Sequence, residues 1–387
     1  MNPTDFVSTR AGELERRQMP NGLDYVAFVP APLPPTLGYD EDLIALLSEA
    51  DAAVGELAGV GSQLPNPHVL LAPYVRREAV LSSRIEGTQA SLSDVFEDEA
   101  VHEEPTADSP DVQEVRNYVT ALEYGIEQVR NGRVLDNALI LELHQRLMAG
   151  VRGSDKHPGE FRATQNWIGY RGSTPATAIF VPPHPDVLTG ALAAWERFLR
   201  ERARDMPPLV ACALLHQQFE TLHPFLDGNG RIGRLLIPLH LLERKRLPLP
   251  LLYLSAYIEE YKGEYGRLLQ RVRTHGDWEA WLQYFLRGVA ETAREGARRA
   301  HDILEAYERA RDAVADHPYS VRLPKELIGT PFISPVRAAP VLSVTIPTAR
   351  KAIEELKTAD VLHDAAKRGR TPLYVAHEFL DLFTRRG

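Results

Sequence analysis

The residues best suited to chemistry lie between 223 and 234, in the stretch His-Pro-Phe-Leu-Asp-Gly-Asn-Gly-Arg-Ile-Gly-Arg. His223 is the residue here that could take a proton from a hydroxyl at neutral pH, because the reference pKa of histidine is about 6.5. Asp227 offers a hard oxygen ligand of the kind that Mg²⁺ takes from a protein while phosphates and water fill its other positions. A base and a metal ligand this close together favour proton transfer beside a phosphate.

The second half of the stretch is suited to hold an anion. Gly228 and Gly230 allow a left-handed backbone and close approach, so that the N–H groups entering the next helix can converge on a negative charge. Arg231 and Arg234 are three residues apart and each offers a planar fork that fits phosphate oxygens. Base, metal ligand and anion cradle together predict phosphoryl or nucleotidyl transfer, which depends on positioning and charge neutralisation.

A zinc site is an alternative use of the histidines. His216, Glu220 and His223 have i, i+4 and i+7 spacing and share one helix face, which could bind zinc. This alternative leaves the glycines and arginines from Gly228 to Arg234 unexplained, and the chain has no His-Glu-x-x-His signature here.

The whole stretch resembles the signature of the Fic (Fic/DOC) domain, His-x-Phe-x-Asp/Glu-Gly-Asn-Gly-Arg-x-x-Arg, with every fixed position filled. The resemblance implies a mostly α Fic-fold helical bundle with a β-hairpin flap, and an enzyme that moves AMP from ATP to a hydroxyl of a target protein, with Mg²⁺ as the metal. A related branch with kinase activity has lysine in place of the second glycine, so Gly230 favours AMP transfer.

The resemblance also implies roles for individual residues. His223 would be the general base for a Ser, Thr or Tyr hydroxyl of the target, and Asp227 would hold Mg²⁺ on the ATP phosphates. The remaining signature residues would bind the phosphates: Gly228, Asn229, Gly230, Arg231 and Arg234. Tyr265 would lie near the adenine.

A second motif, at 82–87, resembles the family's inhibitory sequence Ser/Thr-x-x-x-Glu-Gly/Asn. Ser82 and Glu86 are four residues apart and share a helix face. The resemblance implies that Glu86 pairs with Arg234. A carboxylate on that guanidinium would remove a phosphate ligand and add a repelling charge, so ATP would bind in an unproductive pose.

A hairpin is predicted between residues 166 and 183, where two apolar runs flank Arg-Gly-Ser-Thr-Pro. By resemblance this is the flap on which a target chain adds a strand, with Ile179, Phe180 and Val181 registering it. The simpler alternative is that these three apolar residues form the core of the hairpin.

Composition excludes several classes of protein. The 387 residues carry a net charge of −9, so a surface built throughout to grip nucleic acid is excluded. The one cysteine, Cys212, cannot form an internal disulfide, and no apolar run reaches the ~18 residues of a membrane span. The first residues are charged rather than apolar, so we expect a cytoplasmic protein without membrane contact. A homodimer is compatible with the sequence.

Apolar periodicity predicts helices along most of the chain. Proline-rich residues 20–35 predict an extended strap, and Asp136 is placed to cap a helix. Nine acids without a Lys or Arg between 94 and 114 predict a solvated loop. The expected helices cover 40–57, 67–89, 185–204, 207–222, 231–242 and, in pieces, 255–316. The predicted domains are 1–110, with the inhibitory helix, 111–317, the Fic core, and 318–387.

The last domain differs in charge: residues 320–387 hold 11 Lys and Arg against 7 Asp and Glu, a net +4. A helix at 346–357 and short strands around Lys367-Arg368-Gly369-Arg370 predict a winged helix-turn-helix. Its partner would be DNA or a protein. Three functions therefore remain open: an autoinhibited AMP transferase, the removal of AMP by the same site, and a DNA-binding regulator whose Fic core senses nucleotide.

Overall fold

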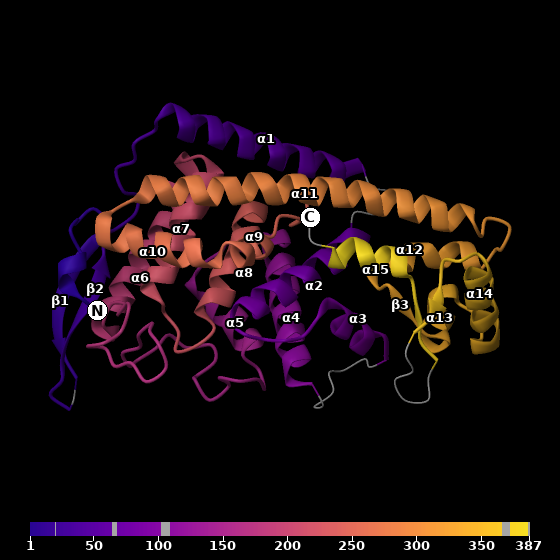
Figure 1. The fold of residues 1–387 in the computed structure, drawn as a ribbon, viewed down its shortest axis with the longest axis horizontal. Coiled ribbons are helices and arrows are strands. Elements are labelled where there is room, and N and C mark those ends of the chain that lie inside the picture. Colours follow the sequence, from indigo (N-terminus) through magenta and orange to yellow (C-terminus); the bar gives the residue numbers. More distant parts are fainter. Residues whose placement is uncertain (20, 64–67, 102–108, 366–371, 386–387) are drawn as a thin grey trace.

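We analysed a computed structural model, which describes residues 1–19, 21–63, 68–101, 109–365 and 372–385. Over these residues the chain is mostly α-helical, as the sequence predicts, with only short strands. The molecule is elongated, with a β-hairpin at one end and the C-terminal helices at the other (Figure 1). Within the described part, no helix is both long enough and apolar enough to span a membrane.

The N-terminal segment forms a hairpin that the sequence analysis did not predict. Strands β1 (Gly12–Gln18) and β2 (Asp24–Pro30) pair antiparallel, from Gly12 opposite Pro30 to Gln18 opposite Asp24. The extended strap predicted for residues 20–35 is thus partly a paired strand, because residues 24–30 of it form β2. Strand β1 carries four charged side chains among its seven residues, so the sequence lacks the apolar alternation that marks a half-buried strand.

Two long helices lie side by side along one edge of the molecule (Figure 1). Helix α1 (Glu41–Gln63) directly follows Asp40, whose side chain accepts a hydrogen bond from the N–H of Leu43 at 2.8 Å. Helix α11 (Trp278–Asp312) is 35 residues long and packs against α1 along its length. This pair covers the helices that carry the site.

The inner helices bring distant parts of the sequence together. Helix α4 packs on α2, α5 and α8, while α7 packs on α6, α8, α10 and α11. The Asp136 side chain caps α5, accepting from the N–H of Leu139 at 2.8 Å, as predicted. The bounds are α2 (His68–Ile85), α3 (Leu92–Val101), α4 (Pro110–Arg130), α5 (Asn137–Leu147), α6 (Pro185–Arg200), η2 (Arg202–Asp205), α7 (Pro208–Leu222), α8 (Asn229–Glu243), α9 (Ser255–Glu260) and α10 (Lys262–His275).

The acidic run between 94 and 114 is not a solvated loop where the structure describes it. Residues 94–101 belong to α3 and residues 110–114 to α4. Asp98 and Glu114 are buried, and each has a basic partner: Arg116 Nη1 lies 2.7 Å from Asp98 and Arg152 Nε lies 3.7 Å from Glu114. The prediction failed because those partners come from elsewhere in the sequence.

The expected hairpin between 166 and 183 is reduced to one antiparallel bridge, between Ile168 and Phe180. Turns occupy most of the segment between them, so no regular strand forms on either side of the bridge. Helix α6 begins directly afterwards, at Pro185. The segment still runs beside β2, whose Phe28 N–H donates to the carbonyl of Val181 at 2.9 Å.

After α11 the chain forms η3 (Ser320–Arg322), α12 (Leu323–Gly329), α13 (Pro335–Leu342), α14 (Ile346–Thr358) and α15 (His377–Thr384). Strands β3 (Phe332–Ile333), β4 (His363–Asp364) and β5 (Tyr374–Val375) make a three-stranded antiparallel sheet in the order β3-β5-β4. Helices α12 and α15 pack against α2 and α11, and the core is continuous with the rest of the molecule. The predicted wing at 367–370 lies outside the described residues, and the domain boundaries stay a prediction.

Candidate active site

The site is built where α7 ends. His223 is the C-cap of α7 and has a left-handed backbone, φ 46° and ψ 59°. A non-glycine residue rarely adopts this conformation, so the surrounding packing must hold it in place. The chain turns sharply here, although the N–H of His223 still donates to Phe219 O at 2.9 Å. This turn ends the helix and places the imidazole at the start of the loop that leads to α8.

Side chains from two segments brace that loop. The amide of Asn229 accepts from the N–H of Phe225 and donates to the carbonyl of Phe225, both at 2.8 Å. Arg162 Nε donates to His223 O at 3.0 Å, and Asn166 Nδ2 donates to His223 O at 3.2 Å and to Phe225 O at 2.8 Å. The loop shape is therefore held before any ligand binds. The side chain of Asn229 serves this bracing.

The loop ends at Gly228, the N-cap of α8, with φ +79°. The first N–H groups of a helix have no partner within the helix, and the helix dipole makes this end positive. Gly228 N–H itself donates to the carboxylate of Asp227 at 2.6 Å. The N–H groups of the next residues, 229–231, lie in the first turn of α8, where the sequence predicts an anion site, and that assignment stays a prediction.

Both arginines of the signature are buried near that site. Arg231 is 1% exposed, and its Nε and Nη1 have no hydrogen-bond partner within the described part of the chain. Its nearest carboxylates are those of Asp227, at 3.7 Å, and Glu114, at 3.9 Å. Burying unpaired guanidinium N–H groups is costly, so these atoms are suited to receive an anionic ligand.

Arg234 donates three hydrogen bonds to the motif at 82–87, which lies about 150 residues earlier in the chain. Its Nε donates to Ser82 Oγ at 2.8 Å, and its Nη2 donates to Ser82 O at 3.0 Å and to Glu86 Oε1 at 2.7 Å. Burial by itself would raise the pKa of Glu86, but the charge and hydrogen bond of Arg234, with the charges of Arg231 and Lys262, together outweigh burial and lower it. The two motifs of the sequence therefore meet, and Glu86 is ionised in this contact.

Gly230 leaves room for the contact between Glu86 and Arg234. A Cβ atom added at Gly230 would lie 2.4 Å from Glu86 Oε1 and 2.9 Å from Arg234 Nη1. Both distances are too short for real atoms, so any larger residue would push Glu86 away from Arg234 or move the start of α8.

The imidazole of His223 is neutral. Burial lowers its pKa to about 3, and the nearby positive charges of Arg273 and Arg162 add to that effect, while Glu86 opposes it. Its Nδ1 is buried without a hydrogen-bond partner in the described structure. A neutral ring with an uncommitted nitrogen can accept a proton, as a general base must.

The Asp227 carboxylate fits the requirements of a magnesium ligand. Its side chain is 41% exposed, and Arg231 is the basic group nearest to it, at 3.7 Å. Because Mg²⁺ commonly takes one or two protein carboxylates and completes its shell with phosphates and water, one accessible carboxylate beside an anion site suffices.

His144 was missed by the sequence analysis. Its ring stacks on Phe225, with ring centres 3.7 Å apart. Its Nδ1 accepts from Gly159 N–H at 2.9 Å, so Nε2 carries the proton and donates to the carbonyl of Asp227 at 3.1 Å. Burial lowers the pKa of His144 to about 4, which keeps this arrangement at neutral pH. His144 thus holds the end of the loop that carries Asp227.

The zinc alternative is not supported by the hydrogen bonds of His216. Its Nδ1 lies 3.0 Å from Gly233 O and its Nε2 lies 2.9 Å from Tyr265 Oη, so both ring nitrogens are occupied. Burial lowers the pKa of His216 to about 4, so the neutral ring donates to the carbonyl and accepts from Tyr265. Its Tyr265 partner, expected near an adenine, is itself buried at 8% exposure.

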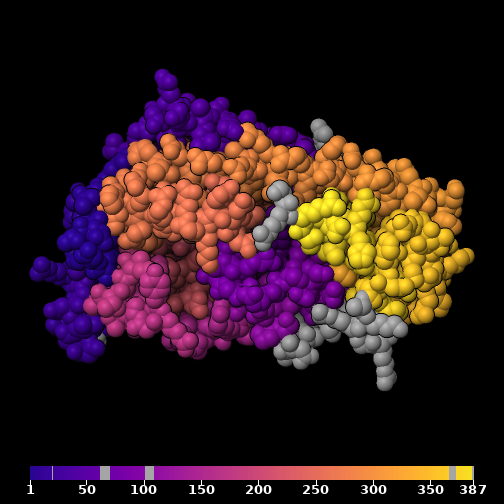
Figure 2. Space-filling model, in the orientation of Figure 1, coloured from indigo at the N-terminus to yellow at the C-terminus, as the bar shows by residue number. Residues whose placement is uncertain are grey.

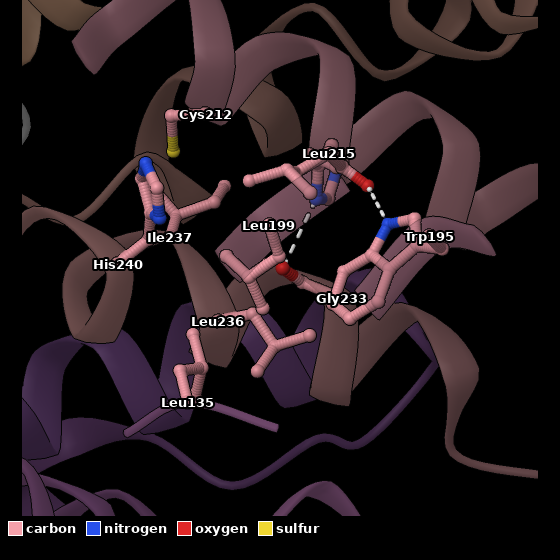
Figure 3. A pocket seen from close by; sticks show the side chains of 10 residues that line it. Leu135, Trp195, Leu199, Cys212, Leu215, Gly233, Leu236, Ile237 and His240 are labelled. Atoms are coloured by element: carbon pink, nitrogen blue, oxygen red, sulfur yellow. Dashed lines mark hydrogen bonds between the residues drawn. The ribbon is translucent and has the colours of Figure 1, made fainter. Parts of the chain in front are cut away.

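A small cavity lies beside His216, between α6, α7 and α8 (Figure 3). Its volume is about 10 Å³, room for one water-sized molecule, and Leu and Trp side chains dominate its lining. It includes no residue from 223 to 231, so it is separate from the anion site. The candidate site lies elsewhere. In Figure 2 the surface of residues near 220–240 is recessed, with residues 150–190, 80–125 and 260–280 around it.

The flap residues differ in exposure. Ile179 is 46% exposed, whereas Phe180 and Val181 are fully buried. Of the three residues predicted to register a target, only Ile179 offers its side chain at the surface. The other two contribute backbone, and their side chains form the core of the bridge, as the simpler alternative holds.

Comparisons with known proteins agree with this geometry. A profile of the Fic/DOC family N-terminal region matches residues 44–127, and a profile of the Fic/DOC family matches residues 134–241. The first includes Ser82 and Glu86, and the second includes the loop and most of α8. The chain therefore contains the N-terminal domain and the Fic domain of the Fic/DOC family.

Two curated relatives carry the name protein adenylyltransferase Fic. The protein from Drosophila ananassae is 38% identical over 99 residues, and that from Drosophila grimshawi is 37% identical over 99 residues. Each match covers 25% of this chain and spans 18% of the relative's length.

Solved structures show the same fold. A Fic family protein from Desulfovibrio desulfuricans G20 superposes with a TM-score of 0.58 at 22% identity, covering 89% of this chain and 98% of its own. Fic-1 from C. elegans superposes with a TM-score of 0.51 at 20% identity, covering 68% and 74% of the two chains. At these identities the likeness establishes the fold.

Proposed function

We propose that this protein is a protein adenylyltransferase, which transfers AMP from ATP to a hydroxyl side chain of a target protein and is held inactive by Glu86. The observation that carries the proposal is the grouping of a neutral His223, the N-terminus of α8 and the buried Arg231, whose Nε and Nη1 have no hydrogen-bond partner in the described structure, around one loop. The names of the relatives support the same reaction class.

In the proposed reaction the target hydroxyl oxygen attacks the α-phosphorus of ATP. His223 takes the hydroxyl proton, a bond from the target oxygen to phosphorus forms, and the bond to the leaving pyrophosphate breaks. The N–H groups at the start of α8 and the guanidinium of Arg231 stabilise negative charge on the phosphates. Asp227 would hold Mg²⁺, which when bound neutralises phosphate charge.

Glu86 inhibits in this proposal because it occupies Arg234. The guanidinium has two donors committed to Ser82 and one to Glu86, so fewer of its five donors are left for the distal phosphates. The Glu86 carboxylate would also repel those phosphates. ATP would still bind, in a pose that does not present the α-phosphorus to the incoming hydroxyl.

The test is labelling with radioactive ATP and Mg²⁺. Glu86→Gly should label itself or an added protein at least about tenfold faster than the natural protein, equivalent to ~1.4 kcal/mol of released inhibition. Adding His223→Ala to Glu86→Gly should then reduce labelling by about 10²-fold to 10⁴-fold, because the base is lost. Mass spectrometry of the labelled protein would give the nucleotide and the modified residue.

Other outcomes would favour the alternatives. If Glu86→Gly is as silent as His223→Ala across many targets, the core is a nucleotide sensor. If the natural protein releases AMP from a pre-modified substrate and Glu86→Gly does not, the site removes AMP.

We propose a second function, DNA binding, for the C-terminal helices, which we interpret as a winged helix. Helices α13 and α14 are joined by a turn at Ser343, which has φ 58°. Among the described elements, α14 makes its main contacts with α13 and η3. Arg350 and Lys351 project from the exposed side of α14. This arrangement fits a recognition helix in a major groove.

Selection from a random duplex DNA library tests this function. The full chain should enrich a common sequence, and Arg350→Ala or Lys351→Ala should weaken binding and lower the salt slope by about one unit each. Lys325→Ala, which removes an exposed lysine from α12, is the matched control and should bind as the parent does. Failure to enrich any sequence would leave protein docking as the role of this surface.

A further inference from the structure

Arg273 on α10 is a buried arginine outside both motifs. It is 4% exposed. Its Nε donates to Thr221 Oγ1 at 3.1 Å and its Nη2 donates to Glu220 O at 3.0 Å. Both acceptors belong to the last turn of α7, directly before His223. Arg273 therefore fixes the backbone from which the proposed base extends.

The other face of the same guanidinium contacts the flap. Its central carbon lies 3.8 Å from the centre of the Phe180 ring, a cation–π distance. Phe180 is fully buried, and its backbone exchanges hydrogen bonds with Ile168 at 2.8 and 3.0 Å. One planar group thus lies between the end of α7 and the bridge that shapes the flap.

The positive charge of Arg273 interacts with the C-terminal end of α7 rather than with an ionised hydrogen-bond acceptor. Its hydrogen-bond acceptors are a hydroxyl, a carbonyl and the amide of Gln270, none of them ionised. A cation at the C-terminus of a helix interacts favourably with the helix dipole. Burial lowers the pKa of Arg273 to about 10, which leaves it charged at neutral pH.

Four groups shape the electrostatics of His223 besides its burial. Arg273 from α10 and Arg162 from the segment after α5 disfavour the imidazolium. Glu86, just after α2, and the backbone carbonyl of Glu220 on α7 favour it. Arg273 has the largest effect of the four.

We propose that Arg273 is a positioning residue for the transfer reaction, which holds His223 and the flap at a fixed separation. The inference rests on the proposed transferase function. Arginine suits this role because its planar fork can bond to the helix end while its face stacks on a ring, whereas lysine supplies a point charge without that geometry.

Two substitutions in a Glu86→Gly parent separate charge from geometry. Arg273→Gln removes the charge, whereas Arg273→Lys keeps it and loses the fork. Both should reduce the rate of self-labelling at saturating ATP by about tenfold to 100-fold, because the base and flap are misaligned. The ATP concentration for half-maximal rate should stay unchanged, because the residues of α8 are untouched. The acidic limb of the pH–rate profile should move upward by about one pH unit in Arg273→Gln and stay in place in Arg273→Lys.

The matched control is Arg271→Gln. Arg271 is exposed on the same helix, two residues away, and pairs with Asp277 at 2.5 Å, so its loss should change neither the rate nor the profile. Phe180→Leu approaches the contact from the flap and should lower the rate without moving the acidic limb. Thermal unfolding of each variant shows whether it is folded at the assay temperature.

NMR titration of the His223 ring gives a readout that is independent of activity. Its midpoint should rise in Arg273→Gln and not in Arg271→Gln. A parent that fails to label would contradict the proposed transferase, and the titration would still test Arg273. If folded Arg273→Gln and Arg273→Lys keep the parent's rate, and the His223 midpoint does not move, Arg273 is a structural residue only.

Discussion

Several side chains of the candidate site serve the shape of the loop. Asn229 satisfies the backbone of Phe225, Arg162 and Asn166 hold the carbonyl of His223, and His144 holds the carbonyl of Asp227. Preorganised donors and acceptors lower the cost of binding a charged ligand, because little has to rearrange when it arrives.

His144 provides a prediction at this scale. His144→Phe keeps a ring against Phe225 but loses both hydrogen bonds, to Gly159 N–H and Asp227 O. The free energy of unfolding should fall by about 1–3 kcal/mol, because two buried backbone groups lose their partners. In a Glu86→Gly parent the labelling rate should also fall, since Asp227 is no longer held.

Denaturant unfolding and labelling assays measure these two effects. His157→Phe is the control, because His157 is exposed in the same part of the chain and should leave both quantities unchanged. A His144→Phe protein with the parent's stability and rate would show that the hydrogen bonds of His144 are dispensable.

At the scale of elements, α2 is the helix that positions Glu86, the residue proposed to inhibit. Glu78, Ser82 and Glu86 follow one another at intervals of four residues and share a face. Glu78 is 1% exposed and accepts from Ser255 Oγ at 2.5 Å and from Tyr118 Oη at 3.2 Å. These bonds tie α2 to α9 and α4, and hold the register in which Glu86 meets Arg234.

Burial raises the pKa of Glu78 to about 7, against 4.5 for the ordinary side chain, although its hydrogen bonds and Arg234 oppose the shift. Between these two values the folded protein binds more protons than the unfolded chain, so its stability falls as pH rises through this window. The loss from Glu78 reaches about 3 kcal/mol at pH 8. Glu78→Gln should remove that loss, because the amide cannot ionise.

Denaturant unfolding at pH 5 and pH 8 measures the difference. Glu220, whose pKa burial also raises to about 7, stays in the variant, so part of the fall should remain. Glu127→Gln, an exposed change on α4, should behave as the natural protein does. An unchanged pH dependence in Glu78→Gln would mean that Glu78 is ionised at low cost.

At the scale of the whole molecule, α11 joins the two ends. Tyr74 of α2 donates to the carbonyl of Gly296 in α11 at 2.9 Å, and Arg299 of α11 donates to the carbonyl of Leu382 in α15 at 2.7 Å. The ring of Phe383 in α15 lies 6.2 Å from that of Tyr74. Helices α12 and α15 are therefore packed directly on α2, the helix that carries Ser82.

Most of the helices and the identity of the loop could be predicted from short windows of sequence. Apolar periodicity, the Asp136 cap and the residues 223–234 are local signals, because each depends on neighbours within a few positions. The N-terminal hairpin and the acidic helices α3 and α4 could not be predicted in this way. Asp98 pairs with Arg116, Glu99 pairs with Arg76, and Arg17 of the hairpin pairs with Asp186, and each of these partners lies outside the few neighbouring positions that a local pattern covers.

The same distinction applies to the site. Residue types and their spacing pointed to His223, Asp227 and the two arginines as candidates, because all of them lie in one contiguous stretch of sequence. The pairing of Glu86 with Arg234 was expected from the resemblance of residues 82–87, and the structure adds its distance of 2.7 Å. Only packing placed His144 under the loop and put Arg273 between α7 and Phe180. Such contacts join residues from about fifty to about 150 positions apart and depend on how whole helices cross, which no local pattern encodes.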